Sequence, residues 1–157
     1  MTTQTATPVQ PTRRRAKRTR LACLATLVAV GVMALGACSP EVDHATDLVN
    51  QSRTSAGRGA IPTNIDLYLK AQGWSQTLAN DQYLHHSNLT DGNGYNWARL
   101  GENVGYGYSL EQVENAFMNS PGHKANILDG GFNRLGVGVT RDSGGRYWVV
   151  QEFMQER

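Results

Sequence analysis

Carboxylate and imidazole side chains gather in three short motifs in the second half of this 157-residue chain. Glu102 lies in GENVG, His123 lies in SPGHKANIL, and His85 and His86 are neighbours in LHHSNL. Only one further histidine, His44, occurs in the sequence. Imidazole with carboxylate is the usual donor set of a zinc site, and also of an acid–base site. The sequence therefore predicts that these motifs build a polar site, either a zinc site or an acid–base site.

The order of these motifs resembles the CAP (SCP-like) superfamily in its short bacterial form. A His-Ser step, a Gly-Glu-Asn step and a Ser-Pro-Gly-His step with Asn-Ile following occur in the order that the family shows. The segment LVNQSRTSAG, with Asn50, Arg53 and Gly57, resembles the first helix of the family, and 136–139 followed by 147–153 resembles its closing strands. The resemblance implies an α+β fold, an α-β-α sandwich in which helices flank a small antiparallel sheet.

The resemblance also implies which residues form a central cleft. The matching positions are His86, Glu102 and His123 for the cleft groups, with Asn103 and Tyr106 as cleft walls. A second glutamate of larger family members falls near Asn119–Ser120 here, where this chain has no acid. The chain is therefore expected to offer three of the four cleft groups.

Two chemical interpretations of this set stay open. Two histidines and one glutamate with an open position make up several catalytic zinc sites, so zinc is a candidate cofactor. The alternative is a hydrogen-bonded network that orders the cleft without a metal. His85 is expected to point away from its neighbour in an extended segment, and His44 is expected at the surface. Neither Ser87 nor Ser120 lies in a Gly-x-Ser-x-Gly motif, so no serine nucleophile is predicted.

The N-terminal segment indicates export. Six basic residues within 13–20 precede an apolar run over 21–37, which is the pattern of a secretory signal. An uncleaved anchor with its basic end in the cytoplasm is the alternative. Leu35–Cys38 resembles a bacterial lipobox, which implies cleavage before Cys38 and acyl chains such as palmitate on that residue. The expected organisation is a leader at 1–37, a lipid anchor and linker at 38–40, and a CAP-like domain at 41–157. The expected location is the outer face of the bacterial membrane, with secretion as the alternative.

Removal of the leader changes the charge balance and leaves no thiol in the domain. The chain has 15 basic and 13 acidic residues, and six of the basic residues but none of the acids belong to the leader. The remaining nine basic and 13 acidic residues give a net charge of −4, which leaves no basic patch for nucleic acid. Cys23 and Cys38 are the only cysteines, so the domain is expected to fold without a disulfide.

Hydrophobic periodicity and turn residues predict the elements that must position the site. Helices are expected over 41–55, 65–84 and 110–119, with a further short helix starting at Pro121. Strands are expected over 97–104, 135–140 and 147–154, the last two joined by a turn at 142–145. Ser109 with Gln112 has the spacing of a capping box, and Ser120 is expected to cap the helix that follows it.

Three functions are compatible with these features. The first is a non-enzymatic binding module for an apolar small molecule, a cell-wall component or another protein. The second is a metal-dependent, peptidase-like hydrolase, and the third is a structural envelope protein without a small ligand. The incomplete set of acids and the absence of a nucleophile favour the binding module. A fold alone does not select a ligand, because one fold serves many sites.

Overall fold

The computed structural model describes residues 39–92, 94 and 96–157. The predicted leader, the lipobox and Cys38 lie outside the described residues. None of the helices in the described part of the chain is long and apolar enough to cross a membrane.

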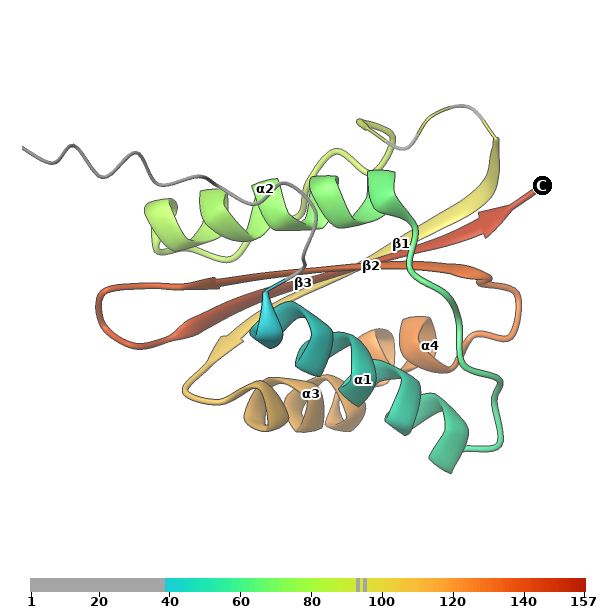
Figure 1. The fold of residues 1–157 in the computed structure, drawn as a ribbon, viewed down its shortest axis with the longest axis horizontal. Helices are drawn as coiled ribbons and strands as arrows, with labels where there is room; N and C mark the ends of the chain where they lie inside the picture. The colour runs from blue at the N-terminus through green and yellow to red at the C-terminus, as the bar shows by residue number, and fades with distance from the viewer. Residues whose placement is uncertain (1–38, 93, 95) are drawn as a thin grey trace, which may run out of the picture. The chain divides into compact units, whose positions relative to one another are not determined.

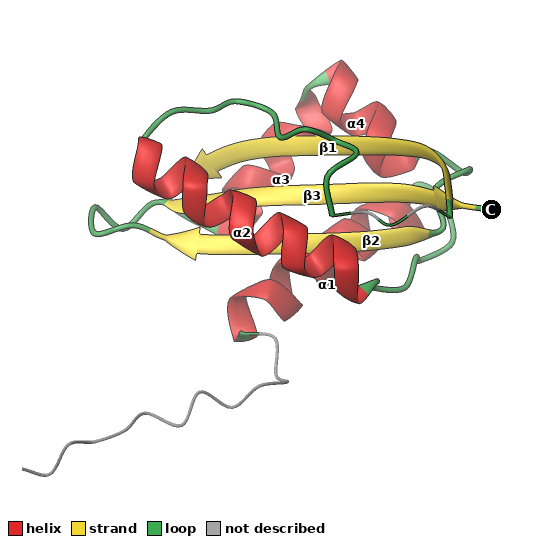
Figure 2. Ribbon diagram, turned by 90° about the horizontal axis from the view of Figure 1, so that it is seen from above, coloured by secondary structure: helices red, strands yellow, loops and turns green. Residues whose placement is uncertain are grey.

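Four helices and three strands form an α-β-α sandwich, which confirms the predicted α+β fold (Figure 1). The elements in chain order are α1 (Pro40–Ser55), α2 (Ile65–Asp81), β1 (Trp97–Gly107), α3 (Leu110–Asn119), α4 (Pro121–Leu128), β2 (Arg134–Arg141) and β3 (Tyr147–Glu156). The strands form one antiparallel sheet in the order β1-β3-β2. Helix α2 crosses one face of this sheet, and α1, α3 and α4 lie on the other (Figure 2).

Helix α1 begins as its sequence predicts. Ser39 is the N-cap and accepts a hydrogen bond from the Val42 amide, and Pro40 occupies the first turn, where its missing N–H costs nothing. Val42, Ala45 and Val49 lie on one face of this helix and are all buried.

Arg53, one of the residues that carried the family resemblance, is also buried on α1. Its Nε donates to the carbonyl of Gly59, and its Nη1 donates to the carbonyls of Ile127 and Asp129. One guanidinium therefore ties α1 to the C-terminal end of α4, because its planar donors satisfy three backbone acceptors at once.

Helix α2 approaches the sheet closely because β2 offers glycines beneath it. A Cβ atom built on Gly136 would collide with the backbone of Leu67, and one built on Gly138 would collide with the backbone of Ala71. The side-chain amide of Gln72 then reaches the outer edge of β2. Its Nε2 donates to the Val139 carbonyl at 3.0 Å, and its Oε1 accepts from the Val139 amide at 3.0 Å.

Helices α3 and α4 follow each other around the serine residues that the sequence indicated. The Gln112 amide donates to Ser109 Oγ at 3.1 Å, which confirms the predicted cap. The Gln112 side chain returns to accept from the Tyr108 amide at 2.8 Å. Ser120 stands at the N-cap position of α4, but its side chain makes no capping hydrogen bond. The prediction that Ser120 caps α4 through its hydroxyl is therefore wrong.

Three predicted boundaries are corrected by the structure. Helix α2 ends at Asp81 rather than Leu84, because Gln82 adopts a left-handed conformation with φ of 55°. Strand β1 runs on to Gly107, and β3 runs on to Glu156, because their backbones stay paired beyond the apolar positions, with a register shift between Trp97 and Arg99. This long β1–β3 pairing sets Glu102 opposite Glu152.

Candidate functional site at the edge of the sheet

His86 and Glu102 meet at the outer edge of β1, the strand at one side of the sheet. His86 lies in the segment that follows α2, and its Nδ1 donates to Glu102 Oε1 at 2.6 Å. The two side chains differ sharply in exposure, because the His86 side chain is 62% exposed and that of Glu102 is 1% exposed. The pair is therefore an imidazole at the surface whose ring is oriented by a buried carboxylate.

Hydrogen bonds to β1 and to α2 fix the loop that carries His86. The Ser87 amide donates to Glu102 Oε1 at 3.0 Å, so Glu102 binds both the ring and the backbone of this loop. The indole of Trp74, on α2, donates to the carbonyl of His85 at 3.1 Å. His85 itself bonds Asp81 and packs against the ring of Trp74, which confirms that it points away from the site.

His123 lies on α4, close enough to His86 for the two imidazoles to interact electrostatically. Burial lowers the pKa of His123, and the nearby charge of His86 lowers it further. Its ring meets the edge of the Phe117 ring, with centroids 4.9 Å apart. Among the described residues, no direct contact links His123 to Glu102. The charge of His86 thus reaches His123, but Glu102 does not lie between the two as a common partner.

The two predicted cleft walls lie on opposite faces of the sheet. Asn103 is fully buried, donates to the His123 carbonyl at 3.2 Å, and accepts from Asn126 Nδ2 at 2.9 Å. Tyr106 is half exposed and packs on the ring of Trp148, on the face that α2 covers. Because side chains alternate along a strand, positions 103 and 106 cannot share a face. Asn103 therefore binds α4 from the interior of the protein.

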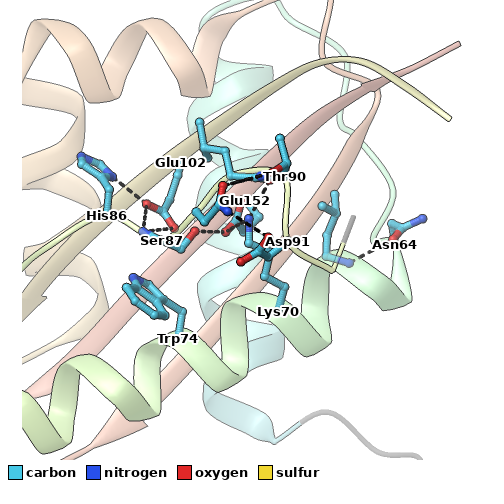
Figure 3. A network of polar contacts seen from close by, with 12 residues as sticks. Asn64, Lys70, Trp74, His86, Ser87, Thr90, Asp91, Glu102 and Glu152 are labelled. Atoms are coloured by element: carbon cyan, nitrogen blue, oxygen red, sulfur yellow. Dashed lines mark hydrogen bonds and ion pairs between the residues drawn. The ribbon is translucent and has the colours of Figure 1, made fainter. Parts of the chain in front are cut away.

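A second carboxylate, missed in the sequence, lies beside Glu102. Glu152 faces α2 from the centre of β3 and is fully buried. Its Oε1 is 3.1 Å from Lys70 Nζ and 3.4 Å from Ser87 Oγ, while its Oε2 has no hydrogen-bond partner among the described residues. Figure 3 shows the two carboxylates joined through Ser87 in one polar network.

The pKa of Glu152 is raised to about 8. Burial is the main cause, and the neighbouring carboxylate of Glu102 adds to it, whereas Lys70 acts in the opposite direction. A proton shared with Glu102 would satisfy the orphaned Oε2 of Glu152. The signal in the sequence was an acid in the middle of an apolar strand, together with a lysine on the apolar face of α2.

Comparison with known proteins places the chain in a family. A model of the cysteine-rich secretory protein family, CAP, matches residues 46–153. The chain belongs to this family. It is 31% identical to the uncharacterized protein YkwD of Bacillus subtilis strain 168 over 114 residues. That match covers 67% of the chain and 44% of YkwD, so this CAP protein spans less than half of its longer relative.

Solved structures share the CAP fold at low sequence identity. An outer surface protein of Borrelia burgdorferi superposes with a TM-score of 0.68 at 15% identity, over 76% of this chain and 95% of that one. An extracellular SCP-domain protein of Bacillus anthracis superposes with a TM-score of 0.64 at 21% identity, over 77% of this chain and 45% of that one. At these identities the likeness establishes the fold.

The placement of the His, Asp and Glu side chains decides whether this CAP domain could hold a metal ion. In the part of the chain that the structure describes, no group of three or more His, Cys, Asp or Glu side chains is placed to hold a metal ion. Glu102 already accepts from His86 and from the Ser87 amide, and Lys70 supplies the positive charge beside Glu152. This arrangement of side chains fits the hydrogen-bonded network rather than a zinc centre with three ligands. Zinc binding by His86, Glu102 and His123 stays a prediction.

Proposed function

We propose that this CAP domain is an exported, membrane-anchored module that binds a cell-wall component through His86. One observation carries the proposal: an imidazole that is 62% exposed stands on a carboxylate that is 1% exposed. Export is supported by the signal-like leader and by the relatives described as outer surface and extracellular proteins. The polar character of the site favours a glycan or peptide of the wall over an apolar small molecule.

The geometry of His86 suits recognition by hydrogen bonding. Glu102 accepts a hydrogen bond from Nδ1–H, which favours the tautomer in which Nε2 of the neutral ring is an acceptor. A hydroxyl or amide N–H of a ligand can donate to this nitrogen. Because the loop is held through the Ser87 amide, little ordering of the ring is needed when the ligand binds.

The surrounding groups favour binding over catalysis. An activated nucleophile needs a base within hydrogen-bond reach. The one carboxylate that accepts from Ser87 Oγ, Glu152 at 3.4 Å, is fully buried and already paired with Lys70, and Ser120 stands at the start of α4. The carboxylate of Glu102 is fully engaged in positioning the loop. A hydrolase function would therefore depend on zinc binding at His86, Glu102 and His123.

His86→Ala is expected to weaken binding to purified peptidoglycan about tenfold, because it removes one hydrogen bond to the ligand worth about 1.5 kcal/mol. Co-sedimentation of the protein with peptidoglycan sacculi measures the dissociation constant. His85→Ala is the matched control, since His85 is the adjacent residue and bonds Asp81 away from the site. Its binding is expected to equal that of wild type.

Two outcomes would reject the binding module. One is the absence of saturable binding by the wild type, and the other is an equal loss in both variants. Calorimetric titration with Zn²⁺ on the same proteins addresses the hydrolase. Saturable heat from wild type that disappears in His86→Ala would replace the binding proposal with a metal site, whereas equal heats in all three proteins would leave zinc without a role at this residue.

The proposed anchor is the acylated thiol and amino group of Cys38, which lies outside the described residues. Cys38→Ala is expected to move the protein from the detergent phase to the aqueous phase, or to leave an unprocessed precursor, because stable anchoring needs acyl chains. Detergent partitioning and intact-mass measurement of the membrane fraction check this. Unchanged partitioning with an unchanged mature mass would show that Cys38 does not hold the protein at the membrane.

A further inference from the structure

Exposed tyrosines gather at one end of the sheet. Tyr83, Tyr106 and Tyr108 are 68%, 49% and 69% exposed. Tyr83 follows the C-terminal end of α2, and the other two lie at the C-terminal end of β1. Figure 2 shows both of these ends beside the β2–β3 hairpin. The C-terminal end of α2 contacts the hairpin directly, because the Gln82 side chain donates to Asp142 at 3.2 Å.

The start of α1 opens onto this same end. A surface pocket of about 320 Å³ is lined by Pro40 and His44 of α1 together with Tyr108 and with Tyr147 of β3. Cys38 lies two residues before Pro40 in the sequence. An extended chain spans at most about 3.5 Å per residue, so two residues of chain, about 7 Å, is the longest tether that a lipid on Cys38 would leave to Pro40.

We propose that this tyrosine-rich end of the domain lies against the lipid bilayer, with the rings of Tyr108, Tyr106 and Tyr83 among the headgroups. The inference rests on the lipid anchor proposed at Cys38. A lipid on that residue places Pro40 at the membrane surface, and the pocket at Pro40 places Tyr108 beside it. Tyrosine suits this position, because its ring is apolar and its hydroxyl is polar, and tyrosines are enriched at membrane–water interfaces.

Several charges at this end are paired, although Glu41 also lines the pocket. His44 pairs with Glu111 at 2.7 Å, and Arg146 pairs with Asp142 at 3.0 Å. Arg146 also lies over the ring of Tyr106, with its guanidinium carbon 5.3 Å from the centroid. The contact with lipid therefore depends on aromatic rings more than on a net charge.

The orientation fixes the height of the binding site above the membrane. Glu102 and Gly107 are five residues apart on β1, which corresponds to about 17 Å at 3.4 Å per residue. With the C-terminal end of β1 at the bilayer, Glu102 lies about that far along the strand, whereas His86 follows Tyr83 by three residues and is at most about 10 Å of extended chain from it. The site then faces the space in which the cell wall begins.

Quenching of a fluorophore by nitroxide-labelled lipids tests the orientation in the acylated protein. Tyr108→Cys and Ile65→Cys are each made in a Cys23→Ala background and labelled at the new thiol. The proteins are reconstituted in phosphatidylglycerol–phosphatidylethanolamine vesicles that carry headgroup nitroxides. Ile65 is the matched control, because it is 63% exposed but begins α2 at the opposite end of the sheet. Quenching at position 108 is expected to exceed quenching at 65 at least threefold.

The mass of the acylated N-terminus is measured in the same samples, so that a failed anchor is told apart from a wrong orientation. Equal quenching at both positions, or stronger quenching at 65, on an acylated protein would overturn the orientation and leave the anchor standing. A protein without acyl chains would overturn both. If Tyr108→Cys does not fold, Tyr83→Cys, at a side chain 68% exposed, replaces it with the same expected result.

Discussion

Gly138→Ala is expected to lower the free energy of unfolding by about 3 kcal/mol, because the added methyl group meets backbone rather than a movable side chain. The Cβ would lie under 3.0 Å from the backbone of Ala71 and of Gln72 on α2. Neither atom can move without moving the helix, so α2 would have to retreat from β2. The apolar contacts that Ala71 and Leu78 make on this face would be lost with it.

Urea unfolding followed by circular dichroism measures this effect, and Gly73→Ala supplies the control. Gly73 lies on α2 itself, and a Cβ there meets nothing within 4 Å. Alanine in place of glycine inside a helix is favourable by about 0.5–1 kcal/mol, so this control is expected to stabilise the protein. Glycine-to-alanine substitution would thus raise the free energy of unfolding on α2 and lower it on the strand beneath. A neutral Gly138→Ala would show that α2 does not depend on this close approach.

Glu152→Gln is expected to stabilise the protein progressively as the pH rises from 5 to 8. In the folded state the pKa of Glu152 is raised to about 8, whereas in the unfolded chain it is near the ordinary value of 4.5. The folded state therefore holds a proton that the unfolded state releases. The stability contributed by this proton is complete below the unfolded pKa and is lost as the pH rises toward the folded pKa, by on the order of 3 kcal/mol between pH 5 and pH 8.

Glutamine removes this loss because its amide resembles the protonated carboxyl. The oxygen of the amide can still accept from Lys70, and its NH₂ can donate toward the carboxylate of Glu102. Urea unfolding at pH 5, 6.5 and 8 measures the difference between variant and wild type. Glu156→Gln, at the surface end of the same strand, is expected to change stability by less than about 0.5 kcal/mol at every pH. A constant difference for Glu152→Gln across the series would rule out the shared proton.

Local features of the fold were predictable because they depend on residues close in sequence. Ser109 and Gln112 cap α3 through contacts within one turn, and Val42 with Val49 share a face because helical spacing requires it. The end of α2 was not predictable in this way. Gln82 takes a left-handed conformation without being glycine, and its amide is held by Asp142, sixty residues further along the chain.

The candidate site was predictable only in part. The family motifs led to His86, Glu102 and His123, and the structure joins the first two directly while His123 packs on Phe117. Glu152 was missed because its role depends on the register of β1 against β3. The spacing of apolar residues within one strand does not determine its register with a strand distant in sequence. The faces of Asn103 and Tyr106 required no structure, because strand alternation alone separates them.

Both outer strands of the sheet have backbone groups occupied by side-chain amides. On β2, Gln72 satisfies both the N–H and the carbonyl of Val139, and on β1, Asn126 donates to the carbonyl of Glu102 at 3.2 Å. Open edges template pairing between molecules and lead to aggregation. These two amides therefore occupy backbone groups of Val139 and Glu102 to which a strand of a second molecule could otherwise bond.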